Sequence, residues 1–175
     1  MENQKVSPGK FAMNYGALLG LILVVIAVIM YVTNMAIEGK QWPMYIYYLI
    51  FPIVIFIAVN NYKKTNGGFL TISEALKVGV AAAVISGIIY LLYNIIFQYI
   101  IEPGFAEQML EASRDKMREM GNFSEDQIEQ SMKWVKWATN PFLGGAIFIG
   151  FSAFFGLIYS LIAGAIMKNK NPYEA

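Results

Sequence analysis

The sequence predicts an all-α, polytopic membrane protein with four transmembrane helices and an extramembrane helical hairpin between the third and the fourth. Of its 175 residues, 57% are hydrophobic and 14% are charged, and this charged share is about half that of a soluble domain. Four stretches carry no charged residue, namely residues 11–37, 41–62, 78–101 and 137–167. Because a soluble domain spreads charges over its whole surface, this distribution excludes a water-soluble fold.

Each uncharged stretch is long enough for one membrane-spanning helix, which needs roughly 20 apolar residues. We expect spans at about residues 13–37, 43–62, 72–101 and 141–167, all within a single domain over residues 1–175. The first stretch is longer than a signal-peptide core and is followed by no small-residue cleavage site. We therefore expect it to be a retained helix.

Local signals mark the ends of these spans. Pro43 suits the first turn of the second span, and Pro52 predicts a kink in its middle. The third span follows Thr71-Ile72-Ser73-Glu74, which has the pattern of a capping box, and it ends before Glu102-Pro103. Gly67-Gly68 predicts a flexible turn between the second and third spans.

The distribution of lysines predicts the orientation. Four spans place residues 1–10, 63–77 and 168–175 on one side of the membrane, with seven lysines against three glutamates, whereas the other side has six basic and nine acidic residues. The positive-inside rule then places both termini in the cytoplasm. The residues counted are Lys5, Lys10, Lys63, Lys64, Lys77, Lys168 and Lys170 against Glu2, Glu74 and Glu174.

Aromatic residues gather at the predicted outer side. They are Trp42, Tyr45, Tyr47 and Tyr48 before and within the second span, and Trp134 and Trp137 before the fourth. Amphipathic rings prefer the headgroup level of a bilayer, so we interpret both groups as interfacial anchors.

The outer segment, residues 102–136, carries 13 of the 25 charges and predicts a helical hairpin. We expect its first helix over residues 103–120, with Gly121-Asn122 as its stop. Its second helix begins at the capping box Ser124-Glu125-Asp126-Gln127. The hairpin is either a docking surface for a partner or a lid over the outer ends of the spans, and the sequence leaves both open.

Small residues recur along three spans and predict helix contacts, because lipid provides no hydrophobic drive for one helix to find another. They are Gly16 and Gly20 in the first span, Gly79, Ala83 and Gly87 in the third, and Ser152, Gly156, Ser160 and Gly164 in the fourth. We expect these three spans to approach closely, within one chain or between the subunits of a homo-oligomer. The bulky second span would pack through large side chains.

One line of polar residues follows the third span in steps of four. It consists of Ser86, Tyr90, Asn94 and Gln98, and Glu102 continues it at the outer end. The line is either a polar pathway or small-molecule pocket that opens outward, or a set of interhelical hydrogen bonds. Asn34, Asn60 and Asn61 lie near span ends, and we expect them to cap those ends.

Several classes of chemistry are excluded by absent residues. The chain has no cysteine and no histidine, which removes disulfides, Ser–His–Asp relays and most zinc sites. It also lacks a phosphate loop and a dinucleotide fingerprint. The net charge of +1 gives no reason to expect nucleic acid. We therefore expect no metal, no cofactor and no enzymatic activity.

The order of features resembles a bacterial family of small four-helix membrane proteins, the DUF4199 family. The resemblance is carried by Gly16 and Gly20, by the entry Gly68-Phe69-Leu70-Thr71-Ile72-Ser73-Glu74-Ala75, by the exit Glu102-Pro103-Gly104-Phe105, by the charged outer segment and by the glycine-rich fourth span. It implies an integral inner-membrane protein and supplies no catalytic residue to transfer.

Three functions follow as hypotheses. The first is a non-enzymatic structural or accessory subunit that assembles with itself or with a larger membrane complex. The alternative is a passive channel or facilitator for a small neutral solute, and it rests on the polar line of the third span. An intramembrane enzyme acting on lipid would need an activated nucleophile, for which the uncharged stretches offer no histidine, cysteine or charged residue.

Overall fold

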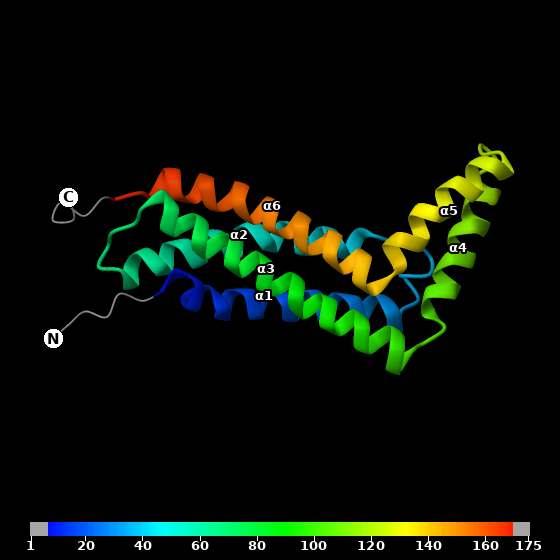
Figure 1. Cartoon of the computed structure of the whole chain (residues 1–175), viewed down its shortest axis with the longest axis horizontal. Coiled ribbons are helices and arrows are strands. Elements are labelled where there is room, and N and C mark those ends of the chain that lie inside the picture. Colours follow the sequence, from blue (N-terminus) through cyan, green and yellow to red (C-terminus); the bar gives the residue numbers. More distant parts are fainter. Residues whose placement is uncertain (1–6, 170–175) are drawn as a thin grey trace.

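The computed structural model describes residues 7–169, and these form an all-α fold (Figure 1). The elements in chain order are α1 (Pro8–Val32), α2 (Trp42–Thr65), α3 (Ile72–Ile96), the π-helical segment η1 (Phe97–Ile101), α4 (Phe105–Glu119), α5 (Glu125–Thr139) and α6 (Pro141–Met167). Four of them, α1, α2, α3 with η1, and α6, are long and apolar enough to cross a membrane. The predicted four long helices and the hairpin between the third and fourth are confirmed.

The four long helices run side by side along the long axis of the molecule (Figure 1). The start of α1, the loop between α2 and α3 and the end of α6 lie at one end, here called the terminal end. At the opposite end, the hairpin end, α4 and α5 project obliquely away from the bundle. At the terminal end, Leu70 and Asn169 form an isolated antiparallel bridge that ties the α2–α3 loop to the end of α6.

The predicted boundaries of the first span, residues 13–37, are wrong at both ends. Helix α1 begins at Pro8 and ends at Val32, because proline suits a first helical turn and Asn34 adopts a left-handed backbone with φ 58°, which ends a right-handed helix. Helix α2 extends past the predicted end at residue 62 to Thr65 and continues through Pro52. The limits of a charge-free stretch therefore show where the apolar run begins and ends, but they do not show where the helix begins and ends.

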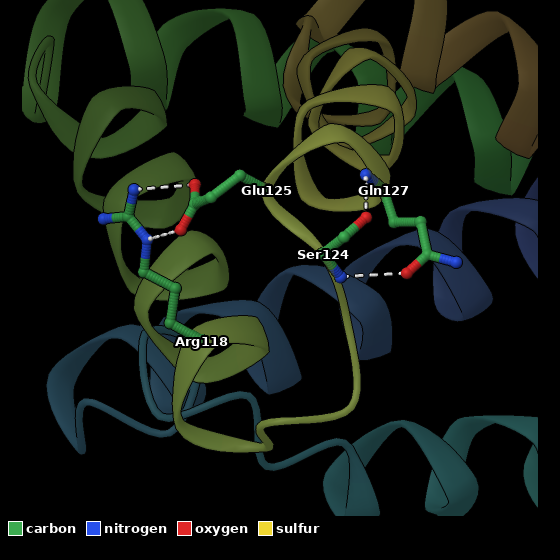
Figure 2. A network of polar contacts seen from close by, with 4 residues as sticks. All are labelled: Arg118, Ser124, Glu125 and Gln127. Atoms are coloured by element: carbon green, nitrogen blue, oxygen red, sulfur yellow. Dashed lines mark hydrogen bonds and ion pairs between the residues drawn. The ribbon is translucent and has the colours of Figure 1, made fainter.

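Both predicted capping boxes are confirmed. The Thr71 backbone N–H donates to Glu74 Oε2 at 2.8 Å, and the Glu74 backbone N–H donates to Thr71 Oγ1 at 3.2 Å. In the hairpin, the Ser124 backbone N–H donates to Gln127 Oε1 at 2.9 Å, and the Gln127 backbone N–H donates to Ser124 Oγ at 3.3 Å (Figure 2). The predicted stop at Gly121 is also confirmed, with φ 65°. These helix starts and stops are set by residues that are close together in the sequence.

The small-residue stripes lie where α3 meets α1 and α6. A Cβ added at Gly156 of α6 would lie 2.5 Å from Ala83 Cβ of α3, and one added at Gly16 of α1 would lie 2.7 Å from Ile85 Cβ. The other close approaches are Gly20 to Ile89, Gly79 to Ser160, Gly87 to Ile149, and Gly164 to Ala75, while Ser152 is buried on the same face of α6. Helix α3 therefore contacts both neighbours closely within one chain.

Asn61 does not cap its helix as expected. Its Nδ2 donates to Tyr15 Oη at 2.9 Å and so links α2 to α1 near the terminal end. The expectation is wrong because α2 continues to Thr65, which leaves Asn61 inside the helix, facing a neighbour.

A two-pronged ion pair closes the hairpin turn. Arg118 Nε donates to Glu125 Oε1 at 3.1 Å, and Nη2 donates to Oε2 at 3.0 Å, so the end of α4 is tied to the start of α5 (Figure 2). These hydrogen bonds hold the pKa of the Glu125 carboxyl below its ordinary value of 4.5. A carboxyl whose pKa is lowered on folding stabilises the fold above the ordinary value, and the contribution is lost as the pH falls through the lowered value.

Replacing Arg118 with glutamine should raise the pKa of Glu125 toward that of a free glutamate, because the donors that favour the carboxylate are removed. A carbon NMR titration of the glutamate carboxyls measures the change. The effect on hairpin stability should be small, since both side chains are exposed. Lys136→Gln removes the same charge at the other end of α5 and serves as the control. An equal change in both variants would contradict a specific Arg118–Glu125 pair.

Candidate functional site

The polar line of α3 does not form one continuous row. Ser86 is fully buried, and its Oγ donates to the Ala83 carbonyl oxygen at 2.7 Å and lies 3.4 Å from Tyr47 Oη. Asn94 Nδ2 donates to the carbonyl oxygen of Tyr90 at 2.9 Å, within the same helix. The structure therefore separates a buried inner member, Ser86, from a pair nearer the hairpin end, Tyr90 and Asn94.

The π-helical segment η1 changes the last part of the line. The Glu102 backbone N–H donates to the Phe97 carbonyl oxygen at 2.8 Å, a bond that spans five residues instead of four. Such a widened turn breaks the step-of-four rule beyond Phe97, where Gln98 and Glu102 lie. Glu102 Oε2 accepts a hydrogen bond from Tyr31 Oη of α1 at 2.8 Å. The segment thus ends with a carboxylate fixed against α1.

A cavity of about 370 Å³ lies between α1, α2, α3, η1 and the start of α4. We call it the tyrosine pocket, since five tyrosines contribute to its wall. The lining residues are Ala27, Met30, Tyr31, Ala36, Gln41, Met44, Tyr45, Tyr48, Tyr90, Tyr93, Asn94, Phe97, Phe105 and Met109. The pocket includes Tyr90 and Asn94 of the predicted line but not Ser86, Gln98 or Glu102. None of its lining residues is charged.

Aromatic contacts hold the wall of the pocket at the hairpin end. The ring of Tyr31 packs edge-on against Phe97 with centroids 4.8 Å apart, and Phe97 packs edge-on against Phe105 at 5.1 Å. Tyr93 stacks on Phe97 at 5.6 Å. Because Phe105 and Met109 belong to α4, the base of the hairpin forms part of the pocket, while the remainder projects away from the bundle (Figure 1).

Toward the terminal end, the pocket is followed by buried side chains of α2 and α3. Its deepest lining residues on the three long helices are Ala27, Tyr48 and Tyr90. One helical turn beyond Tyr90, about 6 Å along the axis, Ser86 is fully buried beside Tyr47. Gly79 and Ala83 follow, in direct contact with α6. These residues of α3, which follow Tyr90 toward the terminal end, are therefore packed and do not line the tyrosine pocket.

One of the predicted interfacial anchors is wrong. The sequence predicts Tyr47 to be an interfacial anchor, but it is 3% exposed and packs on Phe51 inside the bundle. Tyr45 and Tyr48, interpreted in the same way, are 63% and 57% exposed, so the interpretation stays a prediction for them, and both also line the tyrosine pocket. The three tryptophans of the chain, Trp42, Trp134 and Trp137, are exposed at the hairpin end. The sequence signal for the pocket is the set of tyrosines at the same end of three different spans.

Two further cavities have a similar volume. One of about 470 Å³ lies between α2 and α6 and is almost entirely aromatic; Tyr48 forms part of both this cavity and the tyrosine pocket. The other, about 400 Å³, lies between α4 and α5 and is lined mainly by charged residues. Within residues 7–169, no group of three or more acidic residues is placed to hold a metal ion.

One family model, described as a protein of unknown function (DUF4199), matches residues 14–169. The chain belongs to the DUF4199 family. The match covers α2 to α6 and most of α1, and so includes every residue of the tyrosine pocket. Comparisons with curated proteins and with solved structures gave no match. Membership in DUF4199 supplies no residue roles, so the role of the pocket is argued from its geometry.

Proposed function

We propose that this DUF4199 protein is a non-enzymatic accessory subunit of the bacterial inner membrane that binds a small molecule in the tyrosine pocket. The observation that carries the proposal is a pocket that is formed by four helices, shares its wall with the hairpin and is followed on α3 by the buried Ser86. In this proposal the pocket is blind toward the terminal end. A pocket of this size, mostly apolar with a few polar groups, is typical of small-molecule sites. Hydroxyl, amide and thioether groups line it without an activated nucleophile, which favours binding over catalysis.

In the proposed orientation the terminal end faces the cytoplasm and the hairpin end faces outward. The proposed orientation is supported by lysines in the helix turns at the terminal end or directly after them. They are Lys10, Lys63, Lys64, Lys77 and Lys168. The charge count also includes Lys5, Lys170, Glu2 and Glu174, which lie outside the described residues. The exposed tryptophans at the hairpin end would then lie at the outer headgroup level.

A passive channel is less well supported. It needs a continuous polar path, whereas Ser86 is buried and hydrogen-bonded at the inner end of the pocket. Beyond it, small residues of α3 are packed against α6 without space between the helices. A binding pocket needs only the outer opening, so it fits the same residues better.

Cysteine accessibility tests the proposal, since the chain has no cysteine of its own. Asn94→Cys should react with a membrane-impermeant maleimide added outside intact cells, and Ser86→Cys should be protected from both sides. Asn122→Cys at the hairpin tip and Lys64→Cys at the terminal end serve as the outside and inside controls. Labelling of both the Ser86→Cys and the Asn94→Cys variants from outside would support a channel and contradict the blind pocket.

The accessory role is tested with the same hairpin variant. A photo-crosslinker attached at Asn122→Cys should join the chain to one specific membrane protein, or to a second copy, in intact membranes. The same reagent at Ile162→Cys, an exposed position on α6, provides the background. Recovery of the monomer alone at the hairpin, at the same level as at the control, would contradict assembly through the hairpin.

A further inference from the structure

We infer that the tyrosine pocket selects a free organic cation, such as a quaternary ammonium compound with an apolar substituent. The inference rests on the proposed binding function and adds the chemical class of the ligand. Seven of the fourteen lining residues are tyrosine or phenylalanine, and three more are methionine. The face of an aromatic ring carries negative partial charge and attracts a cation within about 6 Å of its centroid.

The rings surround the cavity from several sides. Tyr31 comes from α1, Tyr45 and Tyr48 from α2, and Tyr90 and Tyr93 from α3. Tyr90 and Tyr93 are stacked with centroids 6.2 Å apart, and Tyr93 continues onto Phe97. A ligand inside would therefore meet rings contributed by three helices, which is the arrangement of an aromatic cage. The methionines add polarizable sulfur that packs against apolar substituents.

Glu102 supplies the complementary charge beside this cage. Its carboxylate does not line the cavity, but it accepts the hydrogen bond of Tyr31 Oη at 2.8 Å. A phenol that donates to a carboxylate becomes more electron-rich, which strengthens the attraction of the Tyr31 ring for a cation. Gln108 Nε2 also lies 3.4 Å from the second carboxylate oxygen. The hydrogen bond from Tyr31 Oη therefore places the negative charge of Glu102 directly behind one ring of the pocket wall.

Two lysines at the hairpin end, Lys40 and Lys116, have partners outside the pocket. Lys40 forms an ion pair with Glu38, and Lys116 Nζ lies 3.5 Å from the Glu38 carbonyl oxygen. Neither lysine lines the cavity. The absence of arginine and lysine from the lining also argues against a phospholipid headgroup, because its phosphate would enter without a charged donor. We therefore favour a free cation over a zwitterionic lipid.

The test compares three probes by isothermal titration calorimetry with the full chain in an uncharged maltoside detergent. Phenyltrimethylammonium should bind, whereas its neutral isostere tert-butylbenzene should bind at least several-fold more weakly. Dihexanoylphosphatidylcholine, below its micelle concentration, should not displace the cation. Equal binding of the cation and the isostere, or full displacement by the zwitterionic lipid, would overturn the inference.

Matched variants locate the site. Tyr93→Leu should weaken binding of the cation by roughly 3- to 30-fold, the range expected for one cation–π contact, and Tyr99→Leu should not. Tyr99 is the control because it is an exposed ring of η1 outside the pocket. Glu102→Gln and Tyr31→Phe keep all aromatic rings of the pocket. Both should weaken binding of the cation and leave binding of the isostere unchanged. Equal effects of Tyr93→Leu and Tyr99→Leu, in variants with the wild-type melting temperature, would overturn the inference.

The binding function and the ligand class can be contradicted by different results. If the Asn94→Cys variant is labelled only from outside but the cation has no advantage over its isostere, the binding function stands and the ligand class is wrong. If the Asn94→Cys variant is protected from both sides and no probe binds, the pocket is not a binding site, and both proposals fall together.

Discussion

Gly156→Leu should disrupt the contact between α3 and α6 and cost about 1–3 kcal/mol or more of stability, as overpacking of a closely packed interior does. A Cβ at position 156 would lie 2.5 Å from Ala83 Cβ and 3.2 Å from the Gly79 carbonyl oxygen. Neither atom is the end of a flexible side chain, so the two helices would have to separate. Thermal unfolding in detergent, followed by circular dichroism, measures the loss.

Gly150→Leu is the control for this experiment because it lies on the same helix. A Cβ at Gly150 would meet nothing within 4 Å, so the new side chain points into open space. Leucine there should leave the melting temperature almost unchanged or raise it slightly, since leucine favours the helix over glycine. If both leucine variants had the same melting temperature, close packing at Gly156 would not be what stabilises the bundle.

Ile128→Ala should open the pairing of α4 and α5 while the four long helices remain folded. The hairpin has a small core: Ile128, 2% exposed, and Met132 are the buried residues of α5, and α4 has none. Loss of a buried isoleucine costs about 2–5 kcal/mol, which is large for an element with so little buried area. Hydrogen exchange should show loss of protection over residues 105–139.

Trp134→Ala provides the contrast. It removes a larger side chain from the same helix, but Trp134 is 67% exposed and its ring packs on Trp137. Protection of α4 and α5 should therefore persist. Equal loss of protection in the two variants would mean that the hairpin is held by its outer face and not by Ile128.

Much of the fold followed from residues close in sequence. The charge-free runs predict the long helices because a helix that crosses lipid must be apolar over its whole length. The boxes at Thr71 and Ser124 and the turn at Gly121 follow from groups at most three residues apart, and they are found where expected. The predicted end of α1 is wrong because the left-handed conformation of Asn34 leaves no mark in hydropathy.

The candidate site could be predicted only in part. The spacing of Tyr90 and Asn94 on one helix marks both residues, and both line the pocket. The partners that complete it could not be recognised, since Tyr31 meets Glu102 across 71 residues and Phe105 meets Tyr31 only after the chain has turned into α4. The widened turn of η1 brings Glu102 to Tyr31. The sequence of η1, Phe97–Ile101, contains no residue that would predict a π-helical turn.

The sequence by itself therefore determined the number of long helices, the capping boxes of α3 and α5, and the hairpin. The small-residue stripes marked the contacting faces of α1, α3 and α6, whereas only the tertiary structure decided which residues meet across these contacts and where the tyrosine pocket forms. The physical reason is that an apolar helix has no polar side to mark its outward face, so both its lipid-facing and its buried surfaces carry the same kinds of residue. The rotation of each helix about its axis is then fixed by contacts such as Gly156 with Ala83, which exist only after packing.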